Sequence, residues 1–187
     1  MATIREGNKT ALVVVDVQVG VVRDAWDAPR IVKNVAAAVD KARQAGVPVI
    51  WVQHTDDELV HSSPDWQLPP ELAPAAGEPR IDKHYNSSFE ETNLDAMLAE
   101  LGVSRVVLAG AATNWCIRAT AYGALDRGYD LTLISDAHTT GTIELEGGAV
   151  IEAADIIREL NIGMTWVSYP GRTSGTVSTA GVEFAAA

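Results

Sequence analysis

The sequence predicts an α/β fold in which helices cover both faces of a doubly wound, six-stranded parallel sheet with a Rossmann-like strand order. Short apolar runs rich in β-branched residues, typical of strands buried on both faces of a sheet, alternate with segments of helical periodicity. Glycines stand where several helical segments are expected to end. The chain has 187 residues, 47% of them apolar, so we expect residues 1–187 to form a single domain around one core.

The first half of the chain begins with a predicted βαβ unit. Residues 11–16 form a continuous apolar run that ends in a carboxylate, and residues 47–53 form a second run. Between them, apolar residues recur at helical spacing from Ile31 to Ala42, and Gly46 closes this helix. Two strands joined by one helix are expected to lie parallel in one sheet.

Residues 54–79 interrupt the alternation of strands and helices. They hold five of the eight prolines, which indicates a long loop, and loops of this length often carry function. A short extended piece is expected over residues 80–84. The helix that follows is expected to begin near Thr92 and to end at Gly102.

The second half resumes the alternation. We expect strands over residues 104–110, 130–136 and 164–168, and helices over residues 115–127 and about 147–160. Residues 171–187 are rich in Gly, Ser, Thr and Ala and are expected to form a tail or an oligomerisation arm.

Composition limits the partners of the protein. The chain carries 14 basic against 25 acidic residues, a net charge of −11, so neither nucleic acid nor an anionic membrane is expected to bind it. A single cysteine, the lack of a leader and the lack of an apolar stretch near 18 residues predict a cytoplasmic protein. No Gly-x-x-Gly pattern follows Gly110, and no cofactor is expected.

The only cysteine, Cys116, follows a predicted buried strand at the point where a helix begins. Unpaired N–H groups at a helix start lower the pKa of a thiol and also bind the oxyanion that forms when sulfur attacks a carbonyl. We therefore expect Cys116 to be a reactive thiolate at neutral pH. The alternative is that Cys116 is a small buried hydrophobe in the core.

Two other reactive groups fall near the carboxyl ends of predicted strands, where open parallel sheets bind their ligands. Asp16 ends the first strand and Lys83 lies at the end of the short third one. A lysine near Cys116 favours the thiolate, and a carboxylate takes and returns the proton. The alternatives are a turn or capping role for Asp16 and a solvated Lys83.

Four stretches, in order along the chain, together resemble the isochorismatase-like cysteine hydrolases. They are the strand ending at Asp16 and residues 83–94, 110–116 and 128–137, and the resemblance extends from about residue 10 to residue 168. The resemblance implies that Asp16, Lys83 and Cys116 form a catalytic triad. It also implies a cis peptide bond between Ala111 and Ala112 and an oxyanion hole made by the N–H groups of Ala112 and Cys116. Relatives of this kind commonly form homo-oligomers, so a dimer or tetramer is expected.

The chain departs from two branches of that family. Nicotinamidases bind a metal through an aspartate, a histidine two residues later and another histidine, whereas here Asp56-Asp57-Glu58 lies between His54 and His61. We therefore expect no metal, and nicotinamidase activity is an alternative only if residues 54–61 bind one. Members that hydrolyse the vinyl ether of isochorismate lack the nucleophilic cysteine. The chain thus resembles the metal-free amidohydrolase branch of the family, which includes streptothricin hydrolase and N-carbamoylsarcosine amidohydrolase.

Aromatic residues and a histidine are expected near the proposed site. The candidates for substrate binding are Trp26, His54, Trp66, Tyr85 and Trp115, and the alternative for each is packing. A further histidine, His138, is expected to have a capping or loop role rather than to line the crevice.

Taken together, these features predict a cysteine-dependent hydrolase for a small-molecule substrate. It would cleave a C–N bond of a small amide, ureido compound or lactam through a thioester on Cys116. The alternative is a catalytically idle or regulatory oligomer of the same fold that binds a small ligand. The sequence does not identify the substrate.

Overall fold

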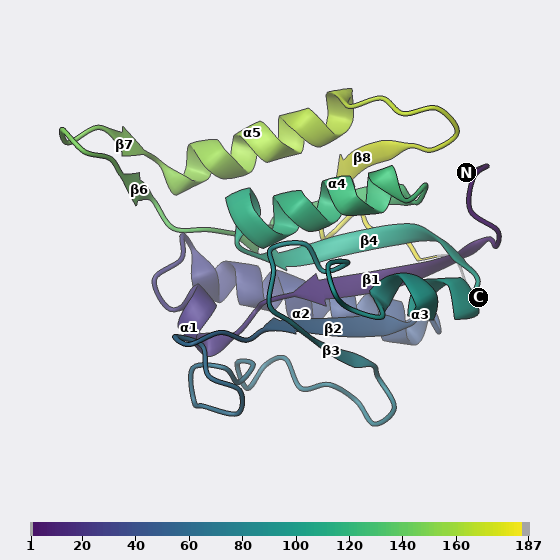
Figure 1. Ribbon diagram of the computed structural model, residues 1–187, viewed down its shortest axis with the longest axis horizontal. Helices are drawn as coiled ribbons and strands as arrows, with labels where there is room; N and C mark the ends of the chain where they lie inside the picture. Colours follow the sequence, from purple (N-terminus) through teal and green to yellow (C-terminus); the bar gives the residue numbers. More distant parts are fainter. Residues whose placement is uncertain (1, 185–187) are drawn as a thin grey trace.

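The computed structural model describes residues 2–184 and contains a six-stranded parallel sheet in the order β3-β2-β1-β4-β5-β8 (Figure 1). This arrangement confirms the predicted fold class and strand order. The strands of this sheet are β1 (Lys9–Val15), β2 (Val49–His54), β3 (Arg80–Lys83), β4 (Val103–Ala111), β5 (Asp130–Thr139) and β8 (Ser174–Val177).

Helices cover both faces of the sheet. They are α1 (Val19–Val22), α2 (Ala28–Gln44), α3 (Leu94–Glu100), the π-helix η1 (Thr113–Ile117), α4 (Arg118–Asp126) and α5 (Ala153–Trp166). Buried residues of α3, α4 and α5 pack on one face, and those of α2 pack on the other. No helix among residues 2–184 is long and apolar enough to cross a membrane.

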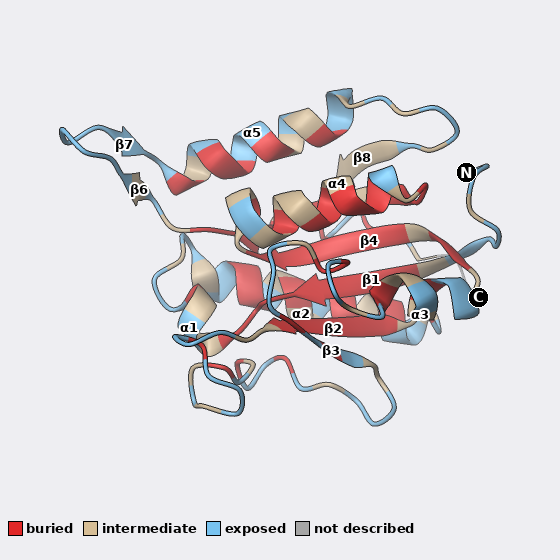
Figure 2. Ribbon diagram, in the orientation of Figure 1, coloured by how far each residue is buried: buried red, intermediate tan, exposed pale blue. Residues whose placement is uncertain are grey.

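Strand β1 shows why the central strands read as continuous apolar runs. Ala11, Val13 and Val15 pack into the core under α3, α4 and α5, whereas Leu12 and Val14 pack into the core under α2. Successive side chains of a strand point to opposite faces, so a strand covered on both faces has no polar side. Figure 2 shows β1, β2 and β4 as buried over most of their length.

The strand expected over residues 164–168 is wrong. Helix α5 continues to Trp166, with Leu160 and Met164 buried four residues apart on its inner face. Trp166 is 83% exposed, which no strand buried on both faces would allow. The sixth strand is instead β8, whose four residues are only half-buried and therefore give a weak hydrophobic signal.

The helix expected over residues 147–160 begins later than predicted. Residues 143–151 contain an antiparallel hairpin made of β6 (Ile143–Glu144) and β7 (Val150–Ile151). Both residues between Glu146 and Ala149 are glycines with positive φ, Gly147 at 87° and Gly148 at 82°, which suits a tight turn. The hairpin extends away from the sheet in Figure 1.

The described part of the C-terminal segment is not a loose tail. Val182 is buried against the α2 face, and the Lys41 ammonium on α2 donates hydrogen bonds to the carbonyls of Thr179, Ala180 and Val182. This part of the predicted arm therefore packs on its own chain as far as residue 184. Residues 185–187 of the predicted arm lie outside the described part.

Glu78 fixes the end of the long loop between β2 and β3. Its carboxylate accepts hydrogen bonds from the Arg43 guanidinium at 2.8 and 2.9 Å, the Trp51 indole at 2.7 Å and the Ala75 N–H at 2.8 Å. The Arg43 hydrogen bonds, helped by those of Trp51 and Ala75, lower the pKa of Glu78 to about 2. The ionised carboxylate thus ties the loop to α2 and β2.

We predict that Glu78→Gln lowers the free energy of unfolding at pH 7 by about 2–3 kcal/mol, because a carboxyl with a depressed pKa stabilises the fold above its unfolded-state pKa. This contribution is lost as pH falls from about 4.5 toward 2. The difference between wild type and variant should therefore shrink by about half at pH 3. Urea denaturation followed by tryptophan fluorescence measures it, with Glu71→Gln on the same loop as control. If wild type and Glu78→Gln differed by the same free energy of unfolding at pH 7 and pH 3, the lowered pKa of Glu78 would be contradicted.

Candidate active site

Asp16, Lys83 and Cys116 meet at the carboxyl end of the sheet. Asp16 directly follows β1, Lys83 is the last residue of β3, and Cys116 lies in η1 after β4. The Lys83 Nζ atom is 2.7 Å from the Asp16 Oδ2 atom and 3.2 Å from the Cys116 Sγ atom. Both charged side chains are buried, with 0% of the lysine and 2% of the aspartate exposed.

The close approach of β1 and β4 places Asp16 beside η1. Asp16 has a positive φ of 51°, a conformation that aspartate tolerates better than most residues, and its N–H donates to the Val52 carbonyl. On β4, Gly110 has a φ of 133°, and a Cβ atom there would lie 1.9 Å from the Val15 carbonyl oxygen. Val15 and Gly110 are partners in the parallel pairing of the two strands, and only glycine fits this close approach.

Lys83 has two further partners. Its ammonium donates to the Tyr85 carbonyl at 3.1 Å, and it lies 3.2 Å from the Nδ1 atom of His54. The His54 Nε2 atom is 3.0 Å from a carboxylate oxygen of Asp56, which only accepts hydrogen bonds. The Nε2 atom therefore carries the proton, and the Nδ1 lone pair faces the lysine. Sequence reasoning expected His54 to bind substrate and missed this contact.

The protonation state of Cys116 differs from the predicted one. Burial, followed by the negative charge of Asp16, raises the pKa of the thiol to about 12, and the Lys83 charge only partly opposes this shift. Burial also raises the pKa of Asp16, against the lowering effect of Lys83. The expectation of a thiolate at neutral pH is thus wrong for this arrangement. The raised pKa describes Cys116 as a thiol beside the Lys83 ammonium, which also pairs with the Asp16 carboxylate.

Cys116 is held by a π-turn rather than by the α-helix start that the sequence predicted. The Ala112 carbonyl accepts hydrogen bonds from the N–H groups of both Trp115 and Ile117, each at 3.1 Å. The five-residue spacing of the second bond defines the turn as π, and such turns are rare outside functional sites. The sequence of η1, Thr-Asn-Trp-Cys-Ile, has no pattern that distinguishes a π-turn from the start of an α-helix.

The backbone before the turn has the expected form. The peptide bond between Ala111 and Ala112 is cis. No carbonyl among residues 2–184 accepts a hydrogen bond from the Ala112 N–H.

The aromatic candidates divide into two groups. Trp66 is only 5% exposed, its indole donates to the Thr55 hydroxyl, and its ring packs on His61, so it holds the long loop together. Trp26, Tyr85 and Trp115 are 40–57% exposed, and Trp115 is next to Cys116. Contact of these three with substrate stays a prediction.

Gln18, which sequence reasoning also missed, joins the β1 end to β2 and the loop. It is fully buried, and its side chain exchanges two hydrogen bonds with the backbone of His54 and donates a third to the Trp66 carbonyl. Its position two residues after Asp16 is the only signal in the sequence.

Residues 54–61 do not form the metal site of the nicotinamidase alternative. His54 pairs with Asp56, whereas His61 lies against Trp66, 3.5 Å from Asp82. Among residues 2–184, no three histidine, cysteine or carboxylate side chains are grouped closely enough to hold a metal ion. The donor set therefore does not fit a metal.

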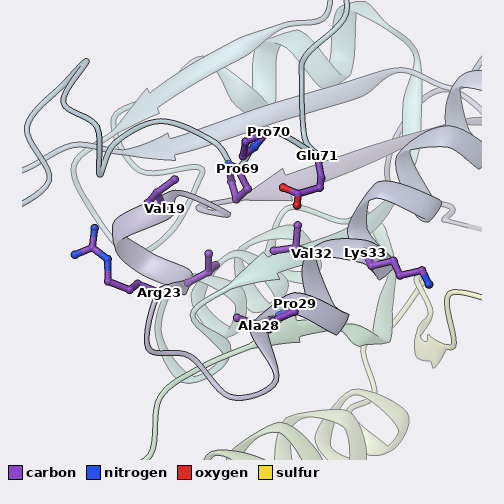
Figure 3. A pocket seen from close by; sticks show the side chains of 10 residues that line it. Val19, Arg23, Ala28, Pro29, Val32, Lys33, Pro69, Pro70 and Glu71 are labelled. Atoms are coloured by element: carbon purple, nitrogen blue, oxygen red, sulfur yellow. The ribbon is translucent and has the colours of Figure 1, made fainter.

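Two hollows lie beside the segments that follow β1 and β2. His54 lines one of about 330 Å³, together with Gly20, Val21, Asp56, Glu58, Leu59 and Asp65. A larger, mainly apolar hollow of about 590 Å³ lies between α1, the first turn of α2 and residues 69–71 (Figure 3). Asp16, Lys83 and Cys116 are absent from the lining of both hollows.

Comparison with known proteins gives consistent results. A family model described as the isochorismatase domain matches residues 10–160. Streptothricin hydrolase of Streptomyces noursei is 32% identical over 146 residues, which cover 74% of this chain and 57% of that enzyme. A probable inactive nicotinamidase of Arabidopsis thaliana is 33% identical over 182 residues, which cover 83% of this chain and 90% of that protein.

Among solved structures, N-carbamoylsarcosine amidase from Thermoplasma acidophilum superposes with a TM-score of 0.74 at 26% identity. The match covers 94% of this chain and 99% of the amidase. The resemblance predicted from the sequence is confirmed by these comparisons.

We predict opposite effects of the two charged neighbours on the reactivity of Cys116. Asp16→Asn removes the charge that raises the thiol pKa, so alkylation by iodoacetamide at pH 7.5 should become about tenfold faster or more. Lys83→Met removes the opposing charge and should slow alkylation. Mass spectrometry measures the rate at the single cysteine, with Asp57→Asn as control. A slower reaction in Asp16→Asn would show that the carboxylate activates the resting thiol.

Proposed function

The chain belongs to the isochorismatase family of hydrolases, and we propose that it is a cysteine-dependent, metal-free enzyme that cleaves the C–N bond of a small amide, ureido compound or lactam. The observation that carries this proposal is a buried cluster in which one ammonium, Lys83, lies within hydrogen-bond distance of both the Asp16 carboxylate and the Cys116 thiol. A nucleophile, a base and a cation are the groups that acyl transfer from nitrogen requires.

In the first half-reaction, the Cys116 sulfur attacks the substrate carbonyl carbon as Asp16 accepts the thiol proton. A C–S bond forms, and the carbonyl oxygen becomes an oxyanion. The N–H groups of Ala112 and Cys116 stabilise it. Asp16 then delivers its proton to the substrate nitrogen, the C–N bond breaks, and the amine leaves a thioester on Cys116.

In the second half-reaction, water replaces the amine. Asp16 accepts a proton from the water as its oxygen bonds to the thioester carbon. The tetrahedral intermediate then expels the sulfur, which regains the proton from Asp16, and the acid leaves. Amide and water are consumed, and acid and amine are released.

Lys83 stabilises the charged states that alternate during this cycle. A thiol is a weak hydrogen-bond acceptor, whereas a thiolate is a strong one, so the Lys83–Cys116 contact strengthens when the proton moves to Asp16. The raised pKa of the resting thiol fits this scheme, because proton transfer then accompanies attack on the substrate instead of preceding it.

The alternative is an idle relative that binds a small ligand. The similarity to a protein named as a probable inactive nicotinamidase favours it. The complete cluster of Asp16, Lys83 and Cys116 favours an enzyme, as does the similarity to proteins named streptothricin hydrolase and N-carbamoylsarcosine amidase.

We predict that a panel of small amides, ureido acids and lactams contains at least one substrate from which the protein releases ammonia or amine. Cys116→Ala should abolish this release. Asp16→Asn should lower kcat by about 10²–10⁴-fold, because a proton shuttle acts in the transition state. A Cys116→Ala protein with full turnover would end the covalent mechanism.

We further predict that turnover is unchanged by EDTA. The reason is that His54 and His61 make separate contacts and do not converge on one ion. Kinetic assays with and without the chelator, combined with elemental analysis, check this. Stoichiometric zinc or iron that is lost together with activity would favour a metal-dependent nicotinamidase.

A further inference from the structure

We propose that His138 is a positioning residue for the nucleophile, because its neutral imidazole binds the Thr113 hydroxyl and so fixes the start of the π-turn that holds Cys116. This inference rests on the proposed function of Cys116. It adds a buried hydrogen-bonded chain that runs from α5 through β5 to η1 and includes none of the three clustered residues.

The hydrogen-bonding groups determine the direction of every bond in the chain. The Asn161 Nδ2 group on α5 donates to the Ser135 carbonyl at 3.0 Å, so the Asn161 Oδ1 atom is the one that faces His138. This oxygen is 3.1 Å from the Nε2 atom of His138, which must therefore donate.

The other ring nitrogen is consequently an acceptor. The His138 Nδ1 atom is 2.9 Å from the Thr113 hydroxyl, so the threonine donates to the histidine. Both side chains are fully buried. Burial lowers the pKa of His138 to about 4, and the ring stays neutral at physiological pH. A protonated ring would present a donor to the Thr113 hydroxyl and would break this pattern.

Thr113 is well placed to orient the nucleophile. It is the first residue of η1, directly follows Ala112 and precedes Cys116 by three residues. The Thr113 carbonyl accepts a hydrogen bond from the Arg118 N–H at the end of the turn. The Thr113 hydroxyl binds His138 and so connects the beginning of the turn to β5. A second tie, from the Thr140 hydroxyl to the Asn114 side chain, also joins the end of β5 to the turn. His138 in β5 thus holds Thr113, and Thr140, directly after β5, holds Asn114.

Small shifts of a nucleophile have large effects on rate, since a displacement of about 1 Å costs about 10²-fold in a reaction. Loss of the Thr113 tie should therefore reduce reactivity at Cys116 more than it reduces substrate binding. A role confined to packing would instead lower stability and leave the kinetics of the folded protein unchanged.

The test compares Thr113→Val, which keeps the shape and loses the hydroxyl, with Thr113→Ser, which keeps the hydroxyl. We expect Thr113→Val to lower kcat by about 10–100-fold with little change in KM, and to shift the rate of iodoacetamide alkylation of the single cysteine, because the sulfur moves relative to Asp16 and Lys83. Thr113→Ser should retain most of both rates. Tyr129→Phe is the matched control, because it removes a buried hydroxyl that donates to Asp95 and lies next to the opposite end of β5.

A second pair of variants tests the histidine itself. His138→Asn offers an acceptor near the position of Nδ1 and should keep more of both rates than His138→Leu, which offers none. If Thr113→Val is too unstable to purify, this pair decides the question.

Wild-type kcat and alkylation in Thr113→Val, or equal losses in Thr113→Val and Thr113→Ser, would overturn the inference. His138→Asn and His138→Leu variants with equal rates would overturn it as well. Alkylation needs no substrate, so it tests the positioning of Cys116 even if the panel of amides yields no hydrolysis. A protein without hydrolysis, in which Thr113→Val but not Thr113→Ser shifts the alkylation rate, would refute the proposed function alone.

Discussion

The site depends on one buried ammonium. Lys83 is fully enclosed, and a buried cation is tolerated only when anions and hydrogen-bond acceptors surround it. Asp16, the Tyr85 carbonyl and the His54 ring meet this need, and they come from segments far apart in the sequence. Correct pairing of β3 with β2 and of β2 with β1 is therefore required before the charge can be accommodated. The site and the sheet consequently stabilise each other.

The same carboxylate has two effects on the sulfur. Asp16 raises the pKa of the Cys116 thiol, yet it is the group best placed to remove its proton. The protonation of one group thus depends on that of the other, and neither group titrates independently. A thiol held in this way is protected from chance oxidation and alkylation, since these reactions require the thiolate.

Sequence reasoning succeeded where the signal was local and failed where it depended on distant burial. The sequence predicted that three residues lie close together, because the carboxyl ends of parallel strands share one edge of the sheet. These residues are Asp16, Lys83 and Cys116. Strand β8 was missed because an edge strand of Ser-Gly-Thr-Val has almost no apolar pattern. The thiol pKa was misjudged because the sequence shows a nearby lysine but not the desolvation that outweighs it. Contacts of His54 and His138 required the folded arrangement, since both have partners more than 20 residues away.

The close approach of Gly110 in β4 to Val15 in the neighbouring strand β1 limits how this scaffold can be altered. A side chain at Gly110 would collide with the Val15 backbone, one residue before Asp16, so even alanine would force the two strands apart. Libraries designed to change substrate preference should hold this position constant. Diversity can instead be placed at Trp26, Tyr85 and Trp115, whose side chains are exposed and are the predicted substrate contacts. The scaffold therefore separates positions that determine foldability from positions at which specificity can evolve.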